Sequence, residues 1–143
     1  MRLLKFSLLS LLFIWATGLL SANETIFNGK DLTGWSAEDM SYWSVQDGAI
    51  AGTKGDQKIQ GNQFLWYDKK VKNFKLTLQV KQIPFAANAG IQFRSKREPN
   101  GQAVGYQADI GKGWWGSLYH EHGRKILAKN LDAEGKNLKP EKW

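Results

Sequence analysis

The densest group of reactive side chains lies in residues 119–124, which read Tyr-His-Glu-His-Gly-Arg. On an extended strand His120 and His122 would share a face, as two metal ligands do. Gly123 follows at once, however, and the sequence identifies no third ligand. An acid–base role for Glu121, flanked by cationic partners, is the chemically simpler interpretation. A metal site and a polar loop without chemistry remain the alternatives.

Polar side chains also recur in two strands that alternation predicts at residues 89–95 and 104–110. In each strand the apolar residues fall on one face and polar residues on the other. If the strands are neighbours, one polar face collects Gln92, Arg94, Gln107 and Asp109. Such a face is suited to hydrogen-bonding sugar hydroxyls. A solvated outer face explains the pattern equally well, since an exposed Arg94–Asp109 pair would contribute only about 0–1 kcal/mol.

The elements that must position these groups are short β-strands, because helical periodicity is nearly absent after residue 22. Short strands with turns between them are typical of a sandwich or barrel. Asp47 and Gly48 between alternating segments predict a tight hairpin, and residues 98–101 predict a further turn. The predicted strands are residues 43–46, 49–52, 63–67, 74–81, 89–95, 104–110 and 115–119.

Tryptophan is the strongest compositional signal after residue 22. Large aromatic rings fill β-sandwich cores, and their flat apolar faces also stack on sugar rings. We expect Trp35 and Trp43 in the core. The adjacent Trp114 and Trp115 must point to opposite faces if they lie on a strand, so at least one of them should be exposed or covered by a loop.

Residues 1–22 have the layout of a secretory signal peptide. Arg2 and Lys5 precede an uncharged apolar segment, and small residues follow it at Ser21 and Ala22. The apolar segment, at about 15 residues, is shorter than the roughly 20 that span a bilayer. We therefore expect a secreted or periplasmic protein with no membrane contact after cleavage; an uncleaved N-terminal anchor is the alternative.

Residues 23–143 form one domain by length. The chain has no cysteine, so an exported fold would depend on packing without disulfides. The net charge of +7 falls to +5 without Arg2 and Lys5, and the basic residues are spread along the chain. Without a dense basic block, the sequence argues against a nucleic-acid partner. The chain stops at Trp143 after a polar, lysine-rich stretch with no closing strand.

Five ordered motifs resemble one known family. They are IFNGKDLTGW at residues 26–35, WSVQDGAI at 43–50, AGIQFRS at 89–95, GYQADIG at 105–111 and WWGSLYHEHGR at 114–124. Together they resemble the 3-keto-disaccharide hydrolase family, also named 3-keto-glucoside lyase/hydratase and formerly a domain of unknown function. The resemblance covers essentially all of residues 24–143.

The resemblance implies an all-β fold, a concanavalin A-like (LamG-like) jelly-roll β-sandwich, in an exported bacterial protein. It also implies a domain that continues beyond the tryptophan matched by Trp143, so the expectation is a C-terminally truncated sandwich. The family often has aspartate at the position of His120. That departure puts a carboxylate pair at 120–121 in doubt, although Glu121 itself fits.

The implied substrate is a glycoside already oxidised to a ketone at C3, and no nicotinamide is required. A ketone at C3 acidifies the C2 proton, so a base can remove it while the glycosidic oxygen leaves C1; water then adds to the enone. We predict Glu121 as the base, Arg94 as the oxyanion or substrate clamp, and Tyr119 or Tyr106 as acid or hydroxyl ligand. A divalent ion replacing the arginine is the alternative electrophile. Further candidates for substrate contact are Gln92, Gln107, Asp109, Trp115, His120 and Arg124.

Two other function classes fit the same residues. Concanavalin-like sandwiches often bind glycans without catalysis, because fold does not fix function. A truncated, inactive remnant is the third possibility, since an unfinished sandwich exposes strand edges that invite aggregation.

Overall fold

A computed structural model describes residues 23–56, 58–84 and 87–136. The predicted signal peptide, residues 1–22, and Trp143 lie outside the described residues. Within the described part the chain is mostly β, and all strand pairs are antiparallel. It contains no α-helix there, only a 3-10 turn, η1 (Met40–Tyr42). The described residues also include no helix of the length and apolarity that a membrane crossing requires.

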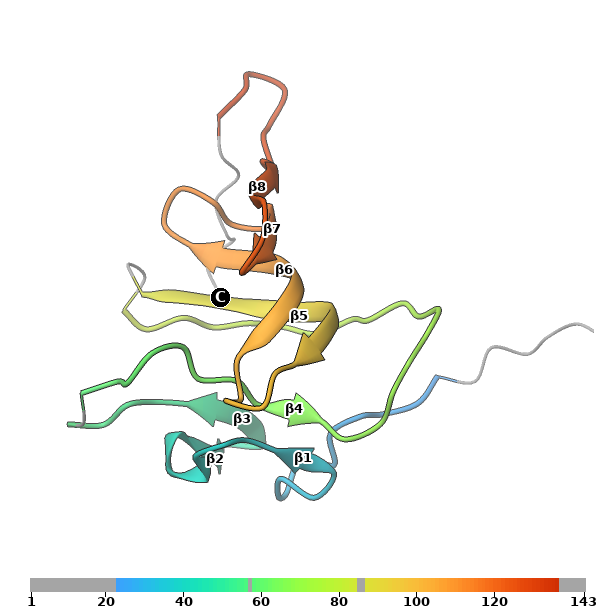
Figure 1. The fold of residues 1–143 in the computed structure, drawn as a ribbon, viewed down its shortest axis with the longest axis vertical. Helices are drawn as coiled ribbons and strands as arrows, with labels where there is room; N and C mark the ends of the chain where they lie inside the picture. The colour runs from blue at the N-terminus through green and yellow to red at the C-terminus, as the bar shows by residue number, and fades with distance from the viewer. Residues whose placement is uncertain (1–22, 57, 85–86, 137–143) are drawn as a thin grey trace, which may run out of the picture.

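The strands form three sheets, which Figure 1 shows as two small pairs beneath a larger sheet. One pair joins β1 (Trp35–Ser36) to β4 (Trp66–Tyr67), and the other joins β2 (Trp43–Gln46) to β3 (Ala49–Gly52). The larger sheet has four strands in sequence order. They are β5 (Asn88–Arg97), β6 (Ala103–Gly111), β7 (Leu118–Glu121) and β8 (Lys125–Ala128).

The predicted hairpin turn is confirmed at Asp47 and Gly48. Gln46 pairs with Ala49, so the loop holds two residues, and both have positive φ, 49° and 73°. That backbone matches the right-handed twist of the flanking strands, which is why Asp-Gly is favoured there. The turn at residues 98–101 is also confirmed, since the amide of Gly101 donates to the carbonyl of Glu98 at 2.9 Å.

The largest departure from the predicted strands is at residues 74–81, which belong to no strand. Their alternating Phe74, Leu76 and Leu78 are 42–45% exposed. Alternation indicates which face each side chain takes, but a strand also needs a neighbour to accept its backbone hydrogen bonds. Two other predicted strands are shorter or displaced, with β4 beginning at Trp66 and β7 at Leu118.

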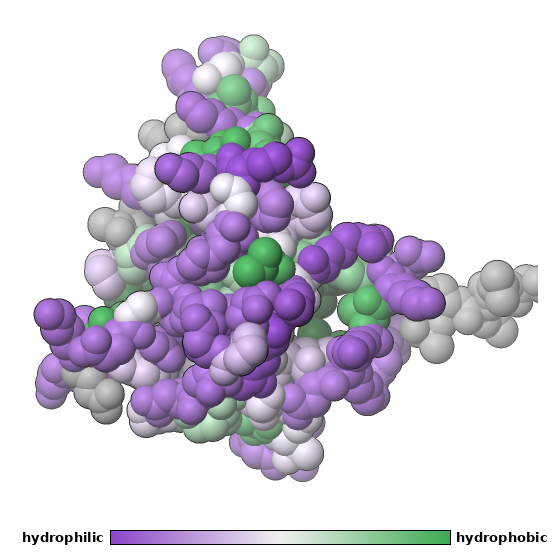
Figure 2. Space-filling model, in the orientation of Figure 1, coloured by the Kyte–Doolittle hydropathy of each residue, from purple (hydrophilic) through white to green (hydrophobic). Residues whose placement is uncertain are grey.

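The core of the described residues is small. Three apolar residues there are buried: Tyr42, Ala103 and Ile110. Trp35 and Trp43, expected in the core, are half-buried; the Trp35 indole packs on Tyr67 and donates to the carbonyl of Ile26. The face drawn in Figure 2 is largely hydrophilic with small hydrophobic areas between. Strand β6 is the most enclosed element, which makes it the frame for the polar residues described next.

Candidate functional site

One face of β6 carries buried polar groups instead of apolar ones. Gln107 is 8% exposed and Asp109 is 6% exposed. Gln92 on β5 lies directly opposite Gln107, and Tyr119 on β7 lies opposite it on the other side. Because directly opposite residues share a face, these side chains form one polar surface across three strands.

A continuous chain of hydrogen bonds runs along this surface. The Ser95 hydroxyl donates to Gln92 Oε1 at 2.7 Å, and Gln92 Nε2 donates to Gln107 Oε1 at 2.9 Å. Gln107 Nε2 donates in turn to Asp109 Oδ1 at 3.0 Å. The donors thus all point the same way, and the chain ends on a carboxylate. We call these four residues the polar row.

Burial raises the pKa of the Asp109 carboxyl above its usual value, and it outweighs the opposite effect of the hydrogen bonds from Gln107 and the amide of Ile110. A carboxyl with a raised pKa is closer to exchanging a proton near neutral pH than an exposed one. The arrangement therefore supplies both hydroxyl-binding amides and a group that can hold a proton.

Two glycines make room for the polar row. A Cβ at Gly90 would lie 2.1 Å from Cδ of Gln107, and one at Gly105 would lie 2.3 Å from the Ser95 hydroxyl oxygen. At distances this short a side chain at either position would force its neighbour to move. The amide and the hydroxyl therefore lie flat on the sheet because both positions lack a side chain.

A β-bulge changes the alternation of β5. Phe93 pairs with Tyr106 and Lys96 with Val104, so two residues of β5 face the single Gly105. The first of them, Arg94, has φ 48°. As a result Ser95, which the pattern had placed on the apolar face, joins the polar row.

The same bulge moves Arg94 away from its predicted place. The sequence pattern put its guanidinium beside Asp109, but Arg94 is exposed and lines an open cavity of about 620 Å³ on the apolar side of the sheet. Its neighbours there include Ile91, Phe93 and Ala108. The structure therefore does not bring Arg94 to the polar row.

Glu121 flanks the polar surface at the end of β7. Its side chain is 12% exposed, and it lies opposite Gly105 on β6. Asn62 Nδ2 donates to Glu121 Oε1 at 3.3 Å, and His122 Nε2 lies 3.8 Å from the same oxygen. Both contacts use Oε1, so the carboxylate is fixed through one oxygen.

Three further residues named by the sequence analysis, Tyr106, His120 and Arg124, form a second cluster on the opposite face of the sheet. The ring of Tyr106 lies 6.0 Å from that of Phe93 and 5.0 Å from that of His120. Arg124 Nη2 donates to the Tyr106 hydroxyl at 3.3 Å. The structure thus separates Tyr106, His120 and Arg124 from the polar row.

The two tryptophans lie in the turn between β6 and β7. Trp114 is 39% exposed and contacts Gly111, whereas Trp115 is half-buried and its indole nitrogen is enclosed. Trp115 was the predicted substrate contact, but Trp114 is the more exposed ring beside the polar surface.

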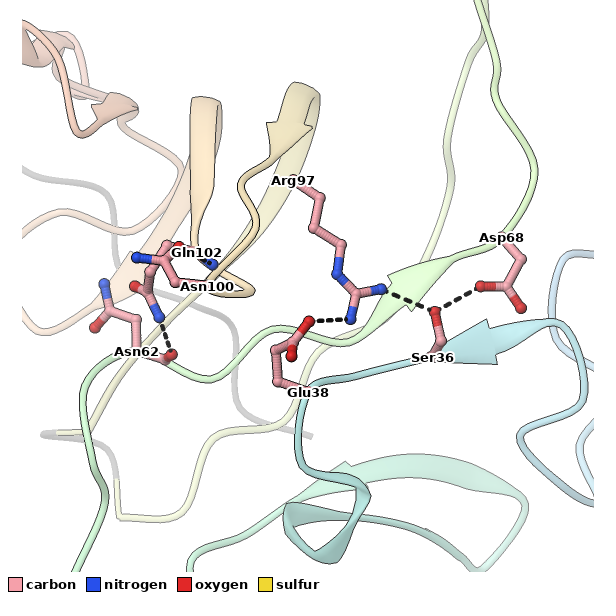
Figure 3. A network of polar contacts seen from close by, with 7 residues as sticks. All are labelled: Ser36, Glu38, Asn62, Asp68, Arg97, Asn100 and Gln102. Carbon is pink, nitrogen blue, oxygen red and sulfur yellow. Dashed lines mark hydrogen bonds and ion pairs between the residues drawn. The ribbon is translucent and has the colours of Figure 1, made fainter.

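A second polar network holds the N-terminal half against the sheet (Figure 3). Arg97 at the end of β5 binds Glu38 Oε1 at 2.7 Å and donates to the Ser36 hydroxyl, which donates to Asp68. Its guanidinium also lies 5.9 Å from the centre of the Trp66 ring. These contacts join β1, β4 and β5.

A separate contact links Gln102, between β5 and β6, to the candidate site. Its side-chain amide donates to the carbonyl of Asn62 at 2.9 Å (Figure 3). The side chain of the same Asn62 donates to Glu121. The position of Glu121 therefore depends on a segment far from it in the sequence. The sequence analysis did not identify Asn62 or Ser95. For Trp114 it predicted only that this residue or Trp115 would be exposed or covered by a loop.

No group of three or more metal-ligating side chains lies together among the described residues. Comparison of the sequence with models of known protein families identifies one family. The model of the 3-keto-alpha-glucoside-1,2-lyase-like domain matches residues 22–143. The chain belongs to this family. Searches of curated proteins and of solved structures each returned no match.

Membership of the 3-keto-alpha-glucoside-1,2-lyase-like family confirms the resemblance inferred from the five motifs. It suggests activity on 3-keto-glucosides and implies a glycoside substrate. In this member, the residues of the family-type motifs divide between the two faces of one sheet, and only one face holds the buried polar row.

Proposed function

We propose that this chain acts on 3-keto-glucosides by elimination and hydration, giving net cleavage of the glycosidic bond. The observation that carries the proposal is the polar row, in which a half-buried and a buried amide lead to the buried Asp109, in a member of this family, with Glu121 beside it. Amides that both donate and accept are suited to hydroxyl groups of a sugar.

Glu121 is the proposed base. Its Oε1 is held by Asn62, so Oε2 is the atom that would take the proton from C2 of the substrate. As that C–H bond breaks, its electrons form the C1–C2 double bond, and the glycosidic oxygen leaves C1 and takes up a proton. Water then adds across the double bond, with its oxygen at C1 and a proton at C2, to release the 3-keto sugar.

Tyr119 is the proposed acid, because it lies on the same face as Gln107 and two residues from Glu121. Gln92, Gln107 and Asp109 would orient the sugar hydroxyls. Arg94 has no part in this arrangement, since it lines the cavity on the other side of the sheet. Stabilisation of the enolate would fall to the amide donors of the polar row.

The test compares Glu121→Gln with the wild type on a methyl 3-keto-α-glucoside. A lost general base should lower turnover by roughly 10²–10⁴-fold. Glu134→Gln, an exposed carboxylate in the turn after β8, is the matched control and should keep wild-type turnover. Substrate carrying deuterium at C2 should react more slowly with the wild type. Normal turnover by Glu121→Gln would refute the assignment.

A glycan-binding module is the second candidate. It is favoured by the composition of the polar row, in which amides outnumber groups that transfer protons, and by the absence of Arg94 from it. Sugar binding by the wild type without turnover of any 3-keto-glucoside would establish this function instead.

Two finer expectations belong to the same proposal. The domain would be a concanavalin-like jelly-roll sandwich, supported by its antiparallel strands and by the alternation at residues 74–81. It would act outside the cytoplasm after removal of residues 1–22, supported by their sequence layout. N-terminal sequencing of the mature protein tests the second expectation, and a start at Met1 would contradict it.

A further inference from the structure

Three hydrogen-bonding side chains lie together on the face of the sheet opposite the polar row. They are Tyr106 on β6, His120 on β7 and Arg124 in the turn between β7 and β8. Tyr106 and His120 are directly opposite each other in the two strands, and their ring centres are 5.0 Å apart. Arg124 Nη2 donates to the Tyr106 hydroxyl at 3.3 Å. We call these three residues the donor cluster, and the proposed function uses none of them.

The imidazole of His120 is held in one orientation by the turn that follows it. A Cβ at Gly123 would lie 2.5, 2.6 and 2.7 Å from Cε1, Nδ1 and Nε2 of this ring. Three consecutive ring atoms are almost equally distant only from a point over the face of the ring, so the imidazole lies flat against Gly123. Its Nδ1 accepts from the Arg124 amide at 3.3 Å. A neutral imidazole that accepts at Nδ1 carries its proton at Nε2, which is therefore a donor.

The other two residues of the donor cluster also present donors. The Tyr106 hydroxyl accepts from Arg124, which leaves the proton of the phenol available to a ligand. Arg124 is exposed, and this bond uses one of the five N–H groups of its guanidinium. One charged and two neutral donor groups are thus gathered on a framework of paired strands, and such groups bind anions.

The charges of the sheet are divided between its two faces. Strands β5 to β8 contain two carboxylates, Asp109 and Glu121, and both belong to the side that holds the polar row. Among the described residues, Arg124 takes part in no ion pair. A single guanidinium beside neutral donors suits a group with one negative charge, and its planar fork matches the two oxygens of a carboxylate.

We propose that the donor cluster is a second binding site, which holds the carboxylate of a small organic acid or an acidic sugar. The Arg124 guanidinium would pair with the carboxylate, and Tyr106 and His120 would supply the neutral donors. The ring of Phe93, 6.0 Å from that of Tyr106, supports the phenol from the side of β5. Because the polar row lies on the other face of the sheet, this site does not depend on the function proposed above.

The experiment titrates the protein with sodium glucuronate at constant pH and follows the imidazole Cε1–H signals by NMR. The chain has two histidines, His120 and His122, so His122→Gln assigns both signals. The His120 signal should shift until it saturates, and that of His122, whose Nε2 lies 3.8 Å from Glu121, should move less. Acetate provides the carboxylate alone and glucose the sugar alone. Equal affinity for acetate would identify any small carboxylate as the ligand, whereas tighter binding of glucuronate would identify an acidic sugar.

Variants separate this site from a general effect of positive charge. Arg124→Met should weaken glucuronate binding roughly tenfold or more, and Tyr106→Phe, which keeps the ring, should weaken it roughly fivefold. Lys112→Gln removes one positive charge from an exposed position beyond the far end of β6 and is the matched control. Its affinity should stay within about twofold of the wild type, because a distant exposed charge is screened by salt.

The outcomes that overturn the inference are distinct from those that concern the proposed function. Equal weakening by Arg124→Met and Lys112→Gln would overturn it, and so would binding of glucose as tight as that of glucuronate. A His120 signal that does not move would also overturn it. Tyr106→Phe removes a single oxygen, so it remains a test of the site if Arg124→Met does not fold. Turnover by Glu121→Gln tests the proposed function separately.

Discussion

Gly90→Ala is the perturbation that the structure predicts most sharply. The new methyl group would lie 2.1 Å from Cδ, 2.4 Å from Cγ and 2.5 Å from Nε2 of Gln107. Gln107 is only 8% exposed, so its side chain can avoid the methyl group only by leaving its place in the polar row. The substitution should therefore act by displacing the amide.

The magnitude follows from the two hydrogen bonds of that amide. Gln107 accepts one bond from Gln92 and donates one to the Asp109 carboxylate. A neutral hydrogen bond contributes about 1 kcal/mol and one to a charged group about 1.5–3 kcal/mol, so Gly90→Ala should lower the free energy of unfolding by about 2–4 kcal/mol. In urea this corresponds to a fall in the unfolding midpoint of roughly 1–2 M.

The assay is urea unfolding followed by tryptophan fluorescence on a double-mutant cycle with Gln107→Ala. Without the glutamine side chain, the methyl group at position 90 has nothing to displace. Alanine is favoured over glycine within a strand by about 0.5–1 kcal/mol, so Gly90→Ala in the Gln107→Ala background should be neutral or stabilising. An equal cost in both backgrounds would refute the reasoning, as would a neutral Gly90→Ala in the wild type.

Three further predictions concern charged groups. Because burial raises the pKa of Asp109 above 3.8, the stability that this carboxyl contributes is present below pH 3.8 and is lost as the pH rises through its folded-state pKa. Asp109→Asn, whose Oδ1 can still accept, should therefore be more stable than the wild type in urea at pH 7. The same stability difference between the two proteins at pH 7 and at pH 3 would contradict this. The pKa of Asp31, lowered to about 2 chiefly by the hydrogen bond from Asn28, should appear in an NMR titration and move toward 3.8 in Asn28→Ala; an ordinary value in the wild type would show that the bond does not form. Arg97→Met should lower the free energy of unfolding in urea by no more than about 1 kcal/mol through loss of this pair, since the Glu38 partner is half exposed and screened; Glu38→Gln should then add little in that background, and an additive cost would argue against the pair.

The sequence predicted the parts of the site that depend on regular alternation. Gln92, Gln107 and Asp109 were placed on one face by period-two spacing in two strands, and the structure joins them by hydrogen bonds. The family was also identifiable from five local motifs, because each is short and continuous in the chain. Local order, in strands and turns, is the information that residue spacing carries directly.

The parts that were missed depend on irregular or distant geometry. A bulge at a non-glycine residue such as Arg94 leaves no local signal, so neither its displacement nor the arrival of Ser95 could be inferred. Asn62 and Glu121 are 59 residues apart, and no pattern within either segment indicates that they meet. The orientation of Trp114 required the backbone of Gly111 beneath it.

The bulge in β5 gives this strand one residue more than its pairing with β6 requires. Ser95 and Arg97 lie on the side of the sheet that holds Gln92 because two residues, Arg94 and Ser95, face Gly105 where a regular strand would have one. Deleting Arg94 would therefore leave Ser95 opposite Gly105 and Arg97 opposite Ala103, on the side that they already occupy. Deleting a residue from the regular part of the strand, such as Ile91, would instead turn the residues on one side of the deletion to the other face of the sheet. For engineering or natural variation, β5 should therefore tolerate the loss of one residue at the bulge and not elsewhere.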